Sequence, residues 1–201
     1  MPHDFSFLPS AAQSSPFLLF LEELTGIKGL IADPHYRGSG LHQIAPGGYL
    51  NLHADFNRYV TFGLDRRVNA FIYLNEDWDD SWGGHLELWN RDLKTCGAKI
   101  APKLGRFVVF SSTDFSYHGH PAPLAAPPGR SRRSLALYYY TNGRPSEEII
   151  DPKYEHSTLF VKGACTDCET CKPPAFADFV RGSEAFSAAR SERRLSVRGS
   201  A

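Results

Sequence analysis

Two side chains that could share one metal ion lie two positions apart in a short β-type run. His53 and Asp55 follow residues 49–52, whose composition is typical of a strand. Residues i and i+2 of a strand point to the same side, so this imidazole and this carboxylate are presented together. The spacing alone is common, and His85 with Glu87 repeats it. The pair therefore predicts a metal site only if a further ligand supports it.

A candidate third ligand, His118, follows the apolar run of residues 107–110. Two imidazoles and one carboxylate form the triad typical of non-haem Fe(II) oxygenases. Such a triad leaves coordination positions open for a co-substrate and dioxygen, whereas a structural zinc site uses four protein ligands. His120 lies two positions further on and competes for this role. We favour His118, because Pro121 constrains the backbone at His120, and expect the remaining imidazole to contact the ligands or the substrate.

A pair of arginines begins the last clear strand of the chain. Arg132 shares one face of this strand with Ser134 and Ala136, while Arg133 belongs to the opposite face. An arginine followed on its own face by small or aromatic residues suits an inward-pointing clamp for a carboxylate. Alternation does not reveal which face is the inner one, so both arginines remain candidates.

The elements expected to position these residues are mostly short strands. Six runs rich in Tyr, Phe, Val and Ile are separated by Gly, Pro, Asn or Asp. A helix should begin at Ser15-Pro16 and end before Gly26. Many short strands with few helices favour a jelly roll over a parallel α/β sheet, so we predict a mainly β fold with an N-terminal helix packed on it. The six expected strands are residues 41–45, 49–53, 68–75, 85–89, 106–111 and 133–141.

Composition limits the classes of function. The chain has 201 residues, about the size of one domain, and 22 Lys and Arg residues balance 22 Asp and Glu residues. A net charge of zero argues against a nucleic-acid binder or a polybasic membrane binder. The longest apolar run, residues 17–21, is too short to cross a bilayer, and no basic segment that would mark a secretory signal precedes it. We therefore expect a cytoplasmic protein with neither nucleic-acid nor membrane partners.

Three of the four cysteines lie close together near the C-terminus. The CxxC spacing of Cys165, Cys168 and Cys171 is compatible with a zinc site, with Cys96 or His156 as fourth ligand. No second CxxC follows, so a cluster of free thiols is the alternative interpretation.

From about Leu41 to Thr141 the chain resembles the Fe(II)/2-oxoglutarate-dependent oxygenases of the prolyl 4-hydroxylase-like branch. The resemblance implies a double-stranded β-helix, the jelly-roll or cupin-like fold, as a dioxygenase core over residues 41–142. Residues 1–40 would form the lead-in and helix, and residues 143–201 a C-terminal decoration with the cysteine-rich segment and a flexible tail. The motifs that carry the resemblance, in order, are Gly48–Asp55 (GYLNLHAD), Phe71–Trp78 (FIYLNEDW), Gly83–Leu88 (GGHLEL), Gly105–Ser111, His118 and Arg132.

The resemblance also implies roles for single residues. His53, Asp55 and His118 would bind Fe(II), while Arg132 and Tyr73 would bind the distal carboxylate of 2-oxoglutarate. The implied activity is a dioxygenase that hydroxylates an unactivated C–H bond, with dioxygen consumed, ascorbate as reductant and a prolyl or peptidyl substrate favoured. Two alternatives stay open: the same chemistry on a free amino acid, sugar or lipid precursor, and a non-catalytic jelly-roll binding module.

Overall fold

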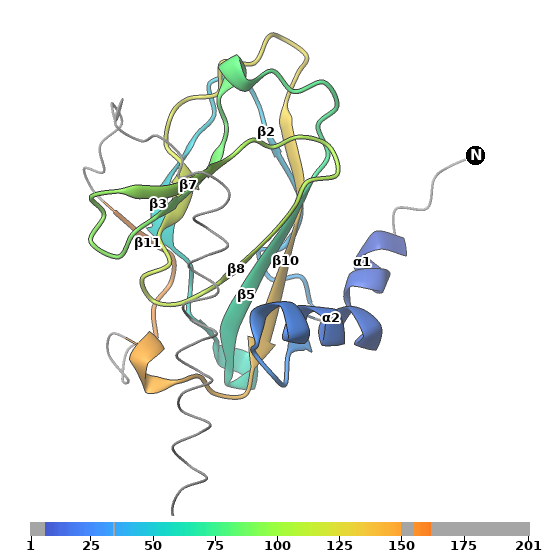
Figure 1. Ribbon diagram of the computed structural model, residues 1–201, viewed down its shortest axis with the longest axis vertical. Coiled ribbons are helices and arrows are strands. Elements are labelled where there is room, and N and C mark those ends of the chain that lie inside the picture. Colours follow the sequence, from blue (N-terminus) through green and yellow to red (C-terminus); the bar gives the residue numbers. More distant parts are fainter. Residues whose placement is uncertain (1–6, 34, 150–154, 162–201) are drawn as a thin grey trace, which may run out of the picture. The chain divides into compact units, whose positions relative to one another are not determined.

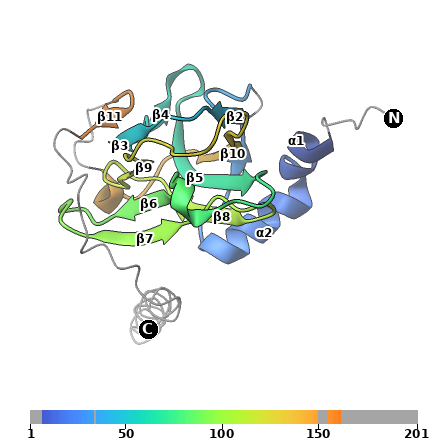
Figure 2. The same ribbon diagram turned by 90° about the horizontal axis from the view of Figure 1, so that it is seen from above.

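Two antiparallel sheets make up most of the protein. The structure is a computed structural model that describes residues 7–33, 35–149 and 155–161, all of which belong to one compact unit of the chain. One sheet has six strands and the other has five, and Figures 1 and 2 show the two sheets as separate layers. This is the double-stranded β-helix, or jelly roll, that the sequence predicts.

The six-stranded sheet is built around its two longest strands, which pair over most of their length. Its strands are β1 (Ile31–Ala32), β2 (Gly40–Ile44), β4 (Arg58–Tyr59), β5 (Leu64–Tyr73), β8 (Phe107–Ser111) and β10 (Arg132–Thr141). The order is β1-β10-β5-β4, with β2 also paired to β10 and β8 to β5.

The five-stranded sheet has the order β11-β3-β9-β6-β7. Its strands are β3 (Leu50–Ala54), β6 (Leu86–Trp89), β7 (Cys96–Ile100), β9 (His118–His120) and β11 (Leu159–Phe160). Gly119 lies so close to β3 that a Cβ atom there would be 2.7 Å from the carbonyl oxygen of Leu50. The small residue between the two histidines of β9 therefore allows this strand to pack tightly on the strand that carries His53.

The outer face of the six-stranded sheet is covered by the two helices, α1 (Phe7–Ala12) and α2 (Ser15–Thr25). Leu21 of α2 is fully buried against Leu135, Leu137 and Tyr139 of β10, and Figure 2 shows both helices on the side away from the five-stranded sheet. Burial of this apolar surface is the main force that fixes the helices on the sheet. Because Leu135, Leu137 and Tyr139 face the helices, the residues of β10 that alternate with them point to the opposite side, toward the five-stranded sheet.

Helix α2 begins at Ser15 and ends before Gly26, as the sequence predicts. Gly26 ends α2 with a positive φ of 72°, and its N–H donates to the carbonyl of Glu22. The N-cap position is Ser14, whose hydroxyl donates to the Ala11 carbonyl and does not cap the helix. No helix among the described residues is long and apolar enough to cross a membrane.

Candidate active site

His53, Asp55 and His118 come together between two neighbouring strands. His53 lies on β3 and Asp55 directly follows it, while His118 begins β9 and is the register partner of His53. The candidate ligand atoms of the three side chains all lie within 4.8 Å of one another. Nε2 of His118 is 3.3 Å from Oδ2 of Asp55, and Nε2 of His53 is 3.6 Å from Oδ1. All three residues are buried, so the sheet itself assembles the triad.

Both histidines are oriented by a backbone carbonyl two residues earlier. Nδ1 of His53 lies 2.8 Å from the carbonyl oxygen of Asn51, and Nδ1 of His118 lies 2.9 Å from that of Ser116. A carbonyl can only accept, so Nδ1 carries the hydrogen and the lone pair of Nε2 faces the other two side chains. Burial lowers the pKa of His118 to about 4, which keeps this ring in the neutral form that a metal ion requires.

Asp55 is fixed by two buried side chains of β5. Its Oδ2 accepts a hydrogen bond from Asn69 at 2.7 Å and lies 2.9 Å from Nη2 of Arg66. Arg66, which is 1% exposed, also donates twice to Oδ1 of Asn69, and its guanidinium lies 3.4 Å from the ring centre of Tyr138. Burial alone would raise the pKa of Asp55, but Arg66, His118 and His53 together hold it well below its usual range. Asp55 is therefore ionised, and Asn69 and Arg66 both contact its Oδ2.

Arg66 and Asn69 are not among the residues predicted from the sequence. Asn69 lies within the predicted strand of residues 68–75, and Arg66 lies two residues before that strand. Nothing in the sequence pattern marks Arg66 as buried, and its partner Asp55, which directly follows β3, could not be identified from the pattern.

A buried cation lies at the beginning of β10. Arg132 is 6% exposed and points inward, whereas Arg133 is exposed on the opposite face. Nε of Arg132 donates to the Gly84 carbonyl at 2.7 Å, and Nη2 donates to the Tyr73 hydroxyl at 3.1 Å. No carboxylate among the described residues forms an ion pair with Arg132. Because a buried charge is costly without a counter-charge, this site suits an incoming carboxylate.

Tyr73 and Gly84 both contact Arg132 and orient it. Burial raises the pKa of Tyr73, so the phenol stays protonated; its oxygen accepts from Arg132 and its hydrogen is available to an acceptor. Gly84 has a positive φ of 65°, and a Cβ atom there would lie 2.8 Å from Leu124 and 3.1 Å from Cδ of Arg132. Glycine therefore lets the backbone approach the arginine closely enough to orient it.

His120 is the third imidazole of this region. It is 3% exposed and lies two residues beyond His118, on the same side of β9. Neither of its ring nitrogens has a hydrogen-bond partner among the described residues. Burial, Arg132 and His53 lower its pKa to about 3. The structure thus brings His118 into the group with His53 and Asp55, while His120 is not part of that group.

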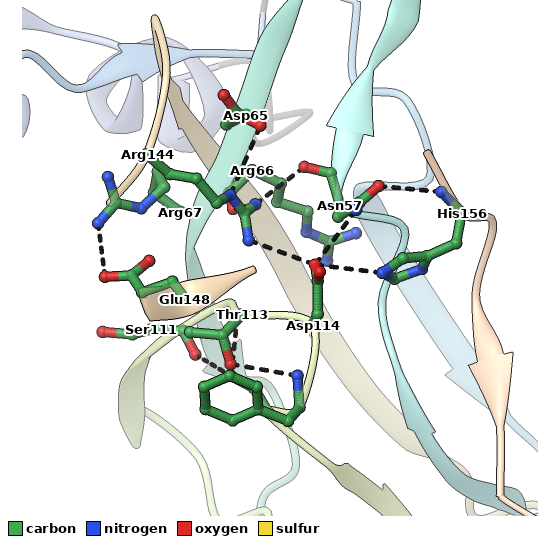
Figure 3. A network of polar contacts seen from close by, with 12 residues as sticks. Asn57, Asp65, Arg66, Arg67, Ser111, Thr113, Asp114, Arg144, Glu148 and His156 are labelled. Atoms are coloured by element: carbon green, nitrogen blue, oxygen red, sulfur yellow. Dashed lines mark hydrogen bonds and ion pairs between the residues drawn. The ribbon is translucent and has the colours of Figure 1, made fainter. Parts of the chain in front are cut away.

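A buried polar network joins Asn57, Asp114, Arg144 and His156 (Figure 3). Asp114, which is 2% exposed, is 3.2 Å from Nε2 of His156 and 3.6 Å from Nη1 of Arg144. Arg144 donates to the Asn57 carbonyl at 2.9 Å, and the Asn57 side chain accepts from the backbone N–H of His156 at 3.1 Å. The network fixes residues 155–161 against the loop that follows Asp55.

The segment fixed in this way places an aromatic ring beside the triad. Phe160 on β11 is the register partner of His53, and the two ring centres are 5.4 Å apart. Phe160 is 57% exposed, so it forms an apolar rim next to a buried polar site.

Other sequence candidates lie apart from this site or outside the described residues. Glu87 contacts Lys99 at 3.0 Å and Trp89 at 2.9 Å, and it forms no metal-type group with His85. Cys96 is buried in β7, where its thiol donates to the Ala98 carbonyl. The expected zinc ligands Cys165, Cys168 and Cys171 lie outside the described residues.

The residues present fit a divalent metal ion and a dicarboxylate. Two imidazoles and one ionised carboxylate are a donor set for Fe(II) that leaves coordination positions open. Arg132 has no carboxylate partner among the described residues, and His120 has no hydrogen-bond partner among them. Both side chains can therefore contact a polar ligand.

The lowered histidine pKa values predict how the stability of the metal-free protein depends on pH. Between pH 6.5, the ordinary histidine value, and about pH 4, the unfolded chain binds protons at His118 and His120 that the folded protein excludes. The free energy of unfolding should therefore fall as the pH falls, by up to about 1.4 kcal/mol per pH unit for each ring. Urea unfolding in a chelating buffer measures this slope, which should be shallower in His118→Leu; an unchanged slope would contradict the burial argument.

Comparisons with known proteins agree with this geometry. Residues 39–140 match the family model described as the 2OG-Fe(II) oxygenase superfamily. Prolyl 3-hydroxylase 2 of Mus musculus is 33% identical over 89 residues, which are 44% of this chain and 10% of that protein, so the chain spans about a tenth of this relative.

Solved structures of prolyl 4-hydroxylases are also similar. The prolyl 4-hydroxylase structure from Phytophthora capsici has 25% sequence identity to this chain. The match covers 70% of this chain and 46% of the Phytophthora chain, with a TM-score of 0.49. The Pseudomonas putida prolyl 4-hydroxylase is 23% identical, and the match covers 63% of this chain and 62% of the Pseudomonas chain, with a TM-score of 0.42.

Proposed function

Because the chain belongs to the 2OG-Fe(II) oxygenase superfamily, we propose that it is a 2-oxoglutarate-dependent dioxygenase that hydroxylates an unactivated C–H bond. In this proposal His53, Asp55 and His118 bind Fe(II). The observation that carries it is the assembly of these three ligand atoms within 4.8 Å on two paired strands. When bound, Fe(II) and 2-oxoglutarate together supply the activation of dioxygen that C–H hydroxylation needs.

The protein's own residues would hold and orient the reactants. The carbonyls of Asn51 and Ser116 keep Nε2 of the two histidines turned toward the metal position. Arg132 and Tyr73 would bind the distal carboxylate of 2-oxoglutarate, the guanidinium by charge and the phenol by its free hydrogen. The burial of these groups excludes water, which strengthens each polar contact with the co-substrate.

The substrate we favour is a prolyl residue in a peptide. A relative that matches part of this chain is named a prolyl 3-hydroxylase, and the exposed Phe160 beside His53 offers an apolar surface for a peptide. Incubation of proline-containing peptides with the protein, Fe(II), 2-oxoglutarate and ascorbate should yield succinate and a peptide with one added oxygen atom. Turnover of free proline, a sugar or a lipid precursor instead would assign the activity to a small molecule.

The two arginines at the beginning of β10 offer a matched test of the cofactor assignment. Anaerobic addition of 2-oxoglutarate to the Fe(II) protein should give a visible charge-transfer band, which can be titrated to yield a dissociation constant. Arg132→Ala should weaken 2-oxoglutarate binding by about a hundredfold, since charge-assisted hydrogen bonds are lost. Arg133→Ala, on the exposed face, should bind as the wild type does.

Either of two results would contradict the assignment. Equal losses in both variants would show that the inward orientation of Arg132 does not determine binding. A metal-loaded wild type without any band would exclude the oxygenase and favour a jelly-roll binding module.

A further inference from the structure

The buried imidazole of His120 has no part in the triad or in the arginine–tyrosine pair. Both of its ring nitrogens lack a hydrogen-bond partner among the described residues, although the residue is only 3% exposed. A neutral imidazole carries one donor and one acceptor, and burying either without a partner is costly. Buried polar groups in folded proteins nearly always have a partner, so this ring is positioned for a polar ligand.

The position of His120 indicates which ligand that is. On β9 it follows His118 by two residues, so both rings lie on the same side of the strand. Its register partner on β3 is Leu50, three residues before His53, so it lies further along the sheet than the triad. On its other side β9 pairs with β6, where Glu87 is the register partner of Gly119, and β6 begins two residues after Gly84, whose carbonyl accepts from Arg132. His120 therefore lies at the end of β9 that leads toward Gly84 and the arginine, with His118 and the metal position at the other end.

We propose that His120 is a third contact of 2-oxoglutarate, and that it donates a hydrogen bond from its ring to the distal carboxylate held by Arg132 and Tyr73. This inference rests on the proposed function, because it assumes that a 2-oxo dicarboxylate occupies the site. A carboxylate has enough lone pairs to accept from the guanidinium, the phenol and the imidazole together. The imidazole would then be a binding residue for the co-substrate rather than an alternative iron ligand.

The test compares two 2-oxo acids that differ only at the distal end. 2-Oxoglutarate carries the distal carboxylate, whereas 2-oxopentanoate has the same number of carbon atoms and lacks it. Dissociation constants of both are measured anaerobically on Fe(II) protein from the visible band, together with the affinity for Fe(II) alone. The variants are His120→Leu, which removes the donor, and His120→Gln, which keeps one.

We expect His120→Leu to weaken 2-oxoglutarate binding by about tenfold to a hundredfold. Binding of 2-oxopentanoate and of Fe(II) should stay within about twofold of the wild type, since neither uses the lost contact. His120→Gln should recover part of the 2-oxoglutarate affinity. His42→Gln, at an exposed histidine on β2, is the matched control and should bind both acids as the wild type does.

The possible results separate this inference from the proposed function. If the wild type gives the band and His120→Leu binds 2-oxoglutarate equally tightly, the inference fails while the oxygenase stands. Equal weakening of both acids would move the contact to the metal-binding end and overturn the distal assignment. If the wild type binds neither acid, the proposed function fails, and the inference fails with it.

Discussion

Replacing Asp55 by alanine should abolish the anaerobic Fe(II)–2-oxoglutarate band and lower the affinity for Fe(II) by at least about a hundredfold. Asp55 is the only carboxylate of the candidate triad, so its loss leaves two imidazoles to hold a doubly charged ion. The loss also leaves the buried guanidinium of Arg66 without its counter-charge, and an unpaired cation 2.9 Å from the former carboxylate position opposes the metal directly.

The same change has a second consequence, for stability, which must be separated from the first. Removing one partner of a buried ion pair costs about 3–5 kcal/mol, so Asp55→Ala could lose the band simply by unfolding. Asp55→Asn keeps the shape and the hydrogen-bonding oxygen, and thermal unfolding will show whether the variant is folded. Asp92→Ala, in an exposed turn, is the matched control. A folded Asp55→Asn that retained wild-type Fe(II) affinity would refute the metal assignment.

The sequence predicts much of this fold because its long strands are also its regular ones. The strand composition of residues 133–141 and 68–75 identifies β10 and β5, which pair with each other in the six-stranded sheet. β9 could not be identified in this way, since a three-residue strand of His118, Gly119 and His120 has no pattern to recognise. Its position comes from pairing with β3 and β6, which are distant in sequence.

In the candidate site, too, some residues can be predicted from local geometry, whereas others depend on tertiary contacts. The pair His53 and Asp55 is local, so strand geometry alone brings the two side chains together. The choice between Arg132 and Arg133 depends on which face of β10 is covered by α2, and that is a tertiary contact. The role of Arg66 is harder to predict, because it depends on Asp55, a carboxylate that follows a different strand, β3.

Replacing Arg66 should have the second-largest effect, on stability and on metal binding together. Arg66→Met leaves Asp55 buried without a cation, which should lower the free energy of unfolding by about 3–5 kcal/mol. In the folded fraction the carboxylate loses one of the two groups that fix Oδ2, so Fe(II) should bind about tenfold to a hundredfold more weakly. Urea unfolding and Fe(II) titration measure the two effects, with Arg58→Met, at an exposed ion pair, as the control.

A double-mutant cycle distinguishes a specific ion pair from general damage to the core. If Arg66 acts by compensating Asp55, then Arg66→Met should cost far less stability in an Asp55→Asn background, because no buried anion is left without a partner. The coupling between the two positions should then amount to about 1–3 kcal/mol. Additive losses would instead mean that Arg66 stabilises the protein through its packing against Tyr138 and Phe56, and that Asn69 alone orients the metal-binding carboxylate.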